Sequence, residues 1–225
     1  MIDSPSNPRN VQRDRLRAAL EHTNLSPGAT AEDIERTCRE AVDLEVRAVV
    51  ANPVWVRTAR EQLKETGVAV VSVAGFPLGA NRTEFKVVEA VRAAIDGAAE
   101  IDLVANIGWM RSGEFERSRD EIVEVRRGLP ENVALKVIIE ATLLAPEELE
   151  RAVEMCVTAE AQFVKTSTGY RGGATEEMIA TLCRLADGRI EVKASGGIKT
   201  AEQSLRLLDA GASRIGSSSC VDILH

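Results

Sequence analysis

Aromatic side chains make up only 3% of this 225-residue sequence, and histidine occurs twice. A sizeable hydrophobic core is still available, because hydrophobic residues account for 44% of the chain. That core must be built mainly from Val, Ala, Leu and Ile. Such a composition suits a parallel α/β protein, whose strands are covered on both faces. The length allows one large domain or two small ones.

Cysteine is also scarce, and the four cysteines form neither a CxxC pair nor a zinc-like spacing with a histidine. They are Cys38, Cys156, Cys183 and Cys220. We interpret them as reduced thiols in or near helices, which fits a cytoplasmic protein. No cluster of His, Asp and Glu stands out as a metal site, so a metal-dependent isomerase or aldolase fits poorly.

The chain has no excess of positive charge and no long hydrophobic run. Its net charge of −7 argues against a general nucleic-acid or membrane surface. The most apolar stretch, residues 68–80, contains Ser, Gly and Pro and is too short to span a bilayer. Residues 1–8 lack the apolar core of a signal peptide, and we expect a disordered tail there, followed by one domain over residues 9–225.

From residue 9 onward, expected strands and helices alternate. Counting 21–23 as a strand gives eight strands, at 21–23, 47–52, 68–73, 100–106, 134–140, from Phe163, from Ile190, and at 214–217. Expected helices lie at 9–20, 31–44, 54–65, 84–96, 114–127, 146–158, 176–186, after a capping box at Thr200, and in one or two turns within 218–225. Eight βα units predict an α/β fold, a single-domain (β/α)₈ barrel. A doubly wound open sheet is the alternative.

Two of these strands contain a lysine near the end of an apolar run. Lys165 lies in Phe163–Tyr170 and Lys193 in Ile190–Gly197, and both runs continue into small residues and glycine. If the two strands are neighbours in one sheet, the lysines could face each other, and two close ammonium groups lower the pKa of at least one of them. A neutral lysine is a nucleophile toward carbonyl carbon. The alternative is two snorkelling lysines or structural ion pairs.

A carboxylate lies in another apolar run. Asp102 stands between Ile101 and Leu103, and in a barrel it could converge with the lysines at the carboxyl ends of the strands. A carboxylate beside a reacting lysine can move protons while a carbinolamine forms and collapses. A structural ion pair, with Lys136 as partner, is the alternative role.

Glycine-rich exits follow the last two strands. Barrels often bind phosphate at these two loops, where glycine lets backbone N–H groups approach the anion and serine adds donors. Together with the two residues that close the Lys165 motif, the candidate substrate- and phosphate-binding residues are Thr168, Gly169, Gly196, Gly197, Gly216, Ser217 and Ser218. Paired lysines, an acid and a phosphate site together predict a Schiff-base aldolase that acts on a sugar phosphate.

These motifs resemble those of the deoxyribose-phosphate aldolase family. The likeness covers about residues 21–218, and the two lysine motifs are specific in combination. The segments that carry it are 164–169, 192–198, 75–79, 100–104, 135–140 and 211–216.

The resemblance implies a (β/α)₈ barrel that reversibly cleaves 2-deoxy-D-ribose 5-phosphate to acetaldehyde and D-glyceraldehyde 3-phosphate. It implies that Lys165 forms the Schiff base, that Lys193 lowers the pKa of Lys165, and that Asp102 transfers protons. It implies no metal and no organic cofactor, and a homodimer or homotetramer.

The chain departs from the family pattern in its first strand, where Glu21-His22-Thr23 replaces the usual Asp-His-Thr. Glu21 and Lys136, the possible ion-pair partner of Asp102, are candidate residues that support the catalytic groups. Two other functions stay open: a Schiff-base aldolase for a different sugar phosphate, and a sugar-phosphate-binding barrel with little turnover.

Overall fold

The computed structural model describes residues 8–225. The first helix begins at Pro8, one residue earlier than expected. The rest of the predicted tail, residues 1–7, lies outside the described residues.

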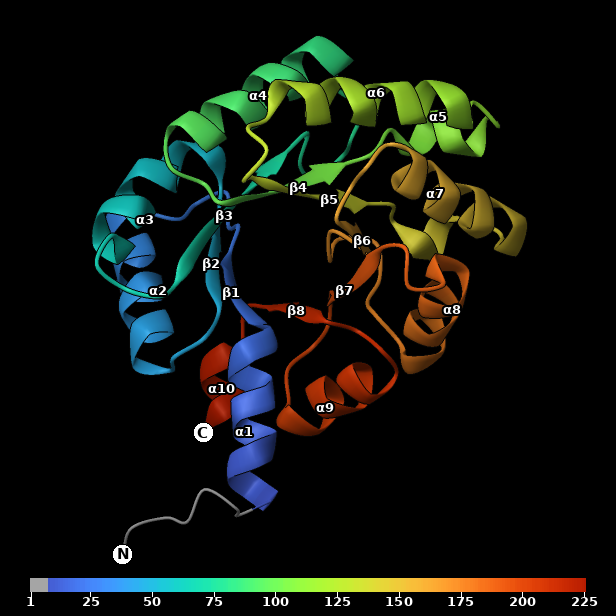
Figure 1. The fold of residues 1–225 in the computed structure, drawn as a ribbon. Coiled ribbons are helices and arrows are strands. Elements are labelled where there is room, and N and C mark those ends of the chain that lie inside the picture. The colour runs from blue at the N-terminus through green and yellow to red at the C-terminus, as the bar shows by residue number, and fades with distance from the viewer. Residues whose placement is uncertain (1–7) are drawn as a thin grey trace, which may run out of the picture.

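Parallel strands form a closed barrel in chain order, and β8 pairs with β1 to complete it. Figure 1 looks down this barrel, with the strands inside a ring of helices. The predicted (β/α)₈ barrel is confirmed, and the open-sheet alternative is wrong. The strands are β1 (Leu20–Asn24), β2 (Ala48–Ala51), β3 (Ala69–Ala74), β4 (Glu100–Val104), β5 (Ala134–Ile138), β6 (Phe163–Lys165), β7 (Glu191–Ser195) and β8 (Arg214–Ser217).

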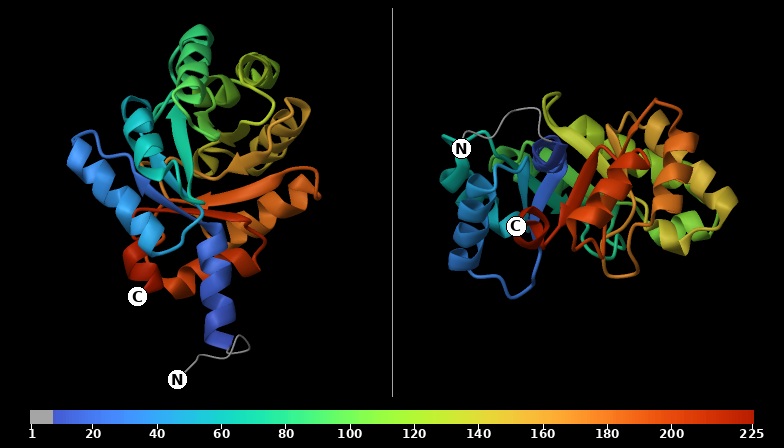
Figure 2. Two further views of the ribbon diagram at one scale, coloured as in Figure 1. Left: turned by 60° about the vertical axis from the view of Figure 1, so that its left-hand side comes forward. Right: turned by 90° about the horizontal axis from the view of Figure 1, so that it is seen from below.

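Helices cover the outer face of the barrel, and α1 lies near α9 and the carboxyl-terminal helix α10, as the views in Figure 2 agree. The α-helices are α1 (Pro8–Ala19), α2 (Ala31–Asp43), α3 (Val56–Leu63), α4 (Thr83–Ile95), α5 (Ile107–Arg111), α6 (Phe115–Gly128), α7 (Pro146–Thr158), α8 (Glu176–Ala186), α9 (Ala201–Asp209) and α10 (Cys220–Leu224). Two 3₁₀ turns, η1 (Pro53–Trp55) and η2 (Ala141–Leu143), precede α3 and α7. No helix within residues 8–225 has both the length and the apolar content needed to cross a bilayer.

Side chains that hydrogen-bond to the nearby backbone determine where several helices begin. The hydroxyl of Thr30 accepts a hydrogen bond from the amide of Asp33, which forms a capping box at the start of α2. Thr200 and Gln203 form the predicted capping box of α9. The predicted cap at Thr200 is therefore confirmed.

Two strands end earlier than expected, and each has a local cause. The expected strand 100–106 ends at Val104, because Asn106 caps the short, unpredicted helix α5. The expected strand 134–140 ends at Ile138, and Glu140 adopts left-handed backbone angles, with φ 49°.

The interior of the barrel divides into an apolar part and a charged part. On β2 and β3 the inward side chains form a small buried cluster of Ala48, Val50, Val71 and Val73. The remaining strands direct titratable side chains inward, because alternate residues of a strand point to the same face. The larger core lies between the strands and the outer helices. The polar site therefore occupies one side of the barrel.

Candidate active site

The two lysines lie directly opposite each other. Lys165 on β6 pairs in register with Lys193 on β7, in a parallel ladder. Lys165 is 4% exposed and Lys193 is fully buried. The expectation that the two lysines face each other is confirmed.

Asp102 on β4 joins them. Its Oδ2 accepts a hydrogen bond from Nζ of Lys165 and another from Nζ of Lys193, each at 2.7 Å. Its Oδ1 accepts one from Nζ of Lys136, at 2.9 Å. The sequence left contact with Lys165 and an ion pair with Lys136 as alternatives for Asp102. In the structure Asp102 makes both contacts.

Glu21 on β1 reaches the same group from the opposite side of the barrel. Its Oε2 accepts a hydrogen bond from Nζ of Lys193, and its Oε1 lies 3.6 Å from Nζ of Lys136. The carboxylate is fully buried, so the longer side chain at this position is accommodated and has a cationic partner.

The charges in this cluster balance when Lys165 is neutral. Apart from the half-exposed Arg47, which lies 3.7 Å from Glu100, the ionisable groups divide into carboxylates (Glu21, Glu100 and Asp102) and bases (Lys136, Lys193, Arg214 and Lys165). Three carboxylates match three of the bases and leave one base over. The excess base leaves a buried net positive charge that deprotonation of a lysine removes.

The pKa of Lys165 is lowered in this cluster. Burial, which disfavours the ammonium form, lowers the pKa of Lys165 to about 8, and Lys193 contributes in the same direction. Asp102 partly opposes this shift. Burial alone would raise the pKa of Asp102, but Lys136, Lys165 and Lys193 hold that pKa well below its usual range. From the sequence, the positive charge of the neighbouring lysine was expected to lower the pKa of Lys165. In the structure, burial lowers this pKa more than Lys193 does.

A cavity of about 240 Å³ opens above Lys165 at the carboxyl ends of β1, β6, β7 and β8. All the predicted substrate- and phosphate-binding residues line it: Thr168, Gly169, Gly196, Gly197, Gly216, Ser217 and Ser218. The structure therefore brings them together with Lys165. Asp102, Lys193, Glu21 and Lys136 lie beneath the cavity and not on its wall.

Some of the predicted donors are already used within the protein. The hydroxyl of Ser217 donates to the carbonyl of Ile198 at 2.7 Å, and that of Thr168 donates to Glu140 at 2.6 Å. In residues 8–225, no hydrogen bond occupies the amides of Gly196 and Gly197. These amides, not the two hydroxyls, are the available anion donors on this wall.

Position 196 requires glycine because of its backbone conformation and its close neighbours. Gly196 has φ +92°, and a Cβ there would lie 2.7 Å from the carbonyl oxygen of Gly172 and 2.7 Å from Oγ of Ser167. The loop after β6 therefore packs backbone to backbone on the loop after β7, which sets the shape of the cavity.

Several residues at the site were not predicted from the sequence. Lys199, exposed at the cavity edge, follows the Gly-Gly-Ile segment, and Tyr170 follows Gly169 on the loop after β6. Glu100 and Arg214 belong to the buried charge cluster. Glu100 carried a usable signal, since it precedes Asp102 by two positions and so shares its face of β4.

Other features of the chain lie away from this site. A larger groove of about 610 Å³ runs over the outside of α7 and α8 and contains none of the buried lysines. The four cysteines are free and lie in helices, as expected. No set of three or more His, Cys, Asp or Glu side chains suited to a metal is present in the described part of the chain. Independence of a cofactor stays a prediction.

The chain is similar to known proteins over most of its length. Residues 16–221 match the DeoC/LacD aldolase family. The chain is 44% identical over 206 residues to a deoxyribose-phosphate aldolase of Thermosynechococcus vestitus, covering 92% of this chain and 94% of that one. It is 47% identical over 210 residues to one of Thermococcus gammatolerans, covering 92% and 93%.

Solved structures agree with this assignment. The tetrameric deoxyribose-phosphate aldolase of Aeropyrum pernix superimposes with a TM-score of 0.85 at 33% identity, covering 97% of each chain. With its closed barrel and its buried lysine pair, the chain belongs to the DeoC/LacD family of aldolases.

Proposed function

We propose that this chain is a class I aldolase that reversibly cleaves 2-deoxy-D-ribose 5-phosphate to acetaldehyde and D-glyceraldehyde 3-phosphate. The observation that carries the proposal is Lys165, a buried lysine with a pKa lowered to about 8 at the base of a cavity lined by backbone amides. The related aldolases named above support the choice of substrate.

The reaction starts at Lys165. Its neutral amine attacks the C1 aldehyde of the open-chain sugar, and the carbinolamine loses water to give an iminium ion. Removal of the proton from the C3 hydroxyl breaks the C2–C3 bond, and the electron pair moves to the iminium nitrogen. The products of this step are glyceraldehyde 3-phosphate and an enamine on Lys165. Protonation at C2 and hydrolysis then release acetaldehyde and regenerate the amine.

The neighbouring residues have separate roles in this scheme. Asp102, 2.7 Å from Nζ of Lys165, transfers protons as the carbinolamine and enamine form and collapse. Lys193 supplies a positive charge that disfavours the ammonium form of Lys165. Gly196, Gly197 and Ser218 hold the phosphate at the other end of the cavity. Glu21 and Lys136 support the cluster from below.

A direct assay tests the proposal. The protein is incubated with 2-deoxy-D-ribose 5-phosphate, and glyceraldehyde 3-phosphate is followed by a coupled NADH assay, with Lys165→Ala as control. Borohydride reduction with substrate should label Lys165 alone. Labelling at Lys193, or turnover by Lys165→Ala, would refute the assignment of the nucleophile.

The assay also distinguishes the alternatives. An aldolase for another sugar phosphate would turn over a different substrate in the same panel. A binding barrel would show thermal stabilisation by the sugar phosphate without product. We further propose a cytoplasmic homo-oligomer; a dimer or tetramer in light scattering would support the assembly, and a monomer would contradict it.

A further inference from the structure

Glu140, at the carboxyl end of β5, is a buried carboxylate outside the mechanism above. It has φ 49° and ψ 57°, in the left-handed region that residues other than glycine rarely occupy. Its side chain is 3% exposed. Within residues 8–225, its carboxylate oxygens accept hydrogen bonds from Thr168 and form no ion pair with a Lys, Arg or His side chain. A strained backbone together with an unpaired buried carboxylate indicates a specific structural task.

The carboxylate of Glu140 is held by a single residue. Oε2 accepts a hydrogen bond from the Thr168 hydroxyl at 2.6 Å, and the Thr168 amide donates to both carboxylate oxygens at 3.3 Å. The same hydroxyl oxygen accepts a hydrogen bond from the amide of Tyr170, at 3.2 Å. Glu140 therefore fixes the conformation of residues 168–170.

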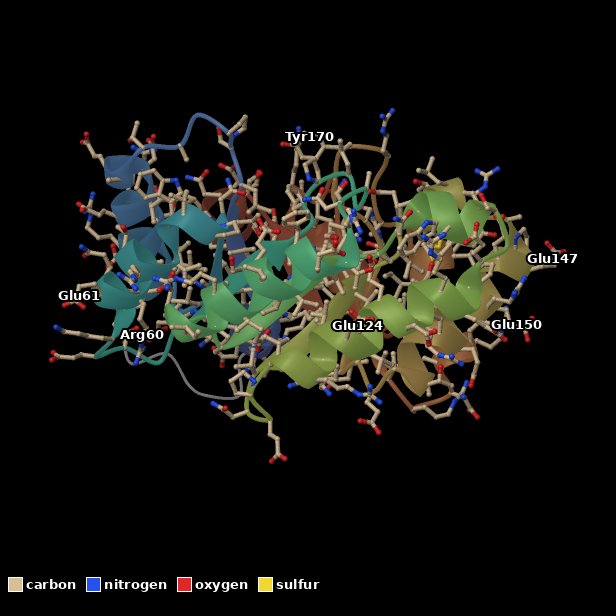
Figure 3. All side chains as sticks on the ribbon, turned by 90° about the horizontal axis from the view of Figure 1, so that it is seen from above. Arg60, Glu61, Glu124, Glu147, Glu150 and Tyr170 are labelled. Atoms are coloured by element: carbon tan, nitrogen blue, oxygen red, sulfur yellow. The ribbon has the colours of Figure 1, made fainter. Side chains whose placement is uncertain are left out.

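These three residues all line the cavity, and Lys165 lies at its base. The ring of Tyr170 also meets Phe76, from the loop after β3, edge to face at 5.8 Å between centroids. Figure 3 shows Tyr170 at the edge of the molecule, on the loop that follows β6. A shift of the loop at Thr168 would thus move one wall of the cavity.

The loop before Thr168 is held by other contacts. Ser167 and Ser195 exchange hydrogen bonds, Oγ of each donating to the carbonyl of the other at 2.9 and 2.6 Å. The amide of Ala141 donates to the carbonyl of Thr166 at 2.8 Å. Lys165 is thereby anchored independently of Glu140. Loss of the Glu140 carboxylate should change the cavity wall and leave the amine in place.

We propose that Glu140 is a positioning residue that acts through Thr168 to set the substrate-binding wall of the lysine cavity. This inference rests on the proposed aldolase function for its kinetic readout. In this proposal, Glu140 influences the affinity for substrate and not the rate of the chemical step.

The test compares Glu140→Gln, Thr168→Val and the double variant. Glutamine keeps the size of the side chain but presents an NH₂ group where the Thr168 amide needs an acceptor. We expect KM for 2-deoxy-D-ribose 5-phosphate to rise about tenfold in each single variant, because a charge-assisted hydrogen bond is lost, with kcat within about twofold. The double variant should match the single ones, since both act through one contact. Thr168→Ser, which keeps the hydroxyl, should restore KM.

The matched control is Glu160→Gln. Glu160 has nearly the same backbone conformation, with φ 58°, but is exposed. Its substitution should leave KM unchanged. An unchanged KM in Glu140→Gln, an equal fall of kcat, or additive effects in the double variant would overturn the proposal.

A second measurement does not depend on turnover. Amide hydrogen exchange over residues 168–170 should be faster in Glu140→Gln than in Glu160→Gln, with β6 and β7 unchanged. If the parent protein shows no cleavage, the aldolase proposal fails and the exchange rates still decide the role of Glu140. Equal exchange in both variants would reject it.

Discussion

Lys165 and Lys193 donate hydrogen bonds to the same oxygen, Oδ2 of Asp102, each at 2.7 Å. One anionic atom thus holds two amines on neighbouring strands, both buried. This arrangement keeps the amines close while their mutual repulsion and burial favour one neutral amine. The two amines differ in their remaining contacts. Lys193 also donates a hydrogen bond to Glu21, whereas Lys165 faces the cavity.

Replacing Asp102 by Asn should separate the two effects of this carboxylate. We expect kcat/KM to fall by at least about 100-fold, because proton transfer is lost. Since Asp102 raises the pKa of Lys165, its removal should also move the pH midpoint of borohydride trapping below that of the parent. Asp120→Asn, an exposed carboxylate on α6, is the control. A midpoint at or above the parental value would contradict this electrostatic role.

Lys165→Met should stabilise the protein near neutral pH. A lysine whose pKa falls from 10.5 to about 8 on folding binds fewer protons in the native state between these values, so stability rises with pH across this window. Below pH 8 the buried ammonium costs about 3 kcal/mol, and methionine removes that cost. Urea unfolding should show a gain at pH 7 that shrinks at pH 10. An equal gain in exposed Lys64→Met, or a gain independent of pH, would contradict this account.

Glu21→Gln removes one of the three carboxylates that contact the lysines of the buried charge cluster. Because Glu21 raises the pKa of Lys165, we expect the trapping midpoint to shift to lower pH. Glu21→Asp keeps the charge but shortens the side chain, and should give a smaller shift. Measurement of trapping against pH in both variants, alongside exposed Glu61→Gln, checks this. A shift to higher pH in Glu21→Gln would show that the charge balance is wrong.

Gly196→Ala should damage the phosphate end of the cavity. A methyl group there would lie 2.7 Å from the Gly172 carbonyl oxygen, at φ +92°, so the loops must move apart. We expect KM for the phosphorylated sugar to rise at least about tenfold, with trapping of acetaldehyde on Lys165 retained. Gly188→Ala, also at positive φ but with open space around it, controls for backbone strain. Equal KM changes in both would reject the contact as the cause.

The fold was accessible from sequence because its signals are local. Apolar strands alternate with helices along the chain, with local signals such as the cap at Thr200, and eight such units permit few arrangements other than the closed barrel. The two lysines were found because a charge in an apolar strand needs a reason. The structure confirms their juxtaposition, although the element ends moved where Asn106 and Glu140 act on the backbone.

The contacts that complete the site were not accessible in this way. Glu21 and Lys193 are 172 positions apart, and their pairing depends on the stagger of the closed barrel. Glu140 was part of a recognised motif, but its left-handed conformation and its bond to Thr168 follow from the three-dimensional turn after β5. The same turn explains why Thr168 has no hydroxyl proton left for a phosphate.

Closure of the barrel also bears on when the chain becomes reactive during its synthesis. In an unfolded chain Lys165 has the ordinary pKa of a lysine and is almost entirely protonated, so cellular aldehydes meet an unreactive ammonium group. The buried cluster is complete only when β8, the last strand of the barrel, has paired with β1. The lowered pKa of Lys165 is thus a product of folding, because it depends on burial and on the charges that the closed barrel brings together.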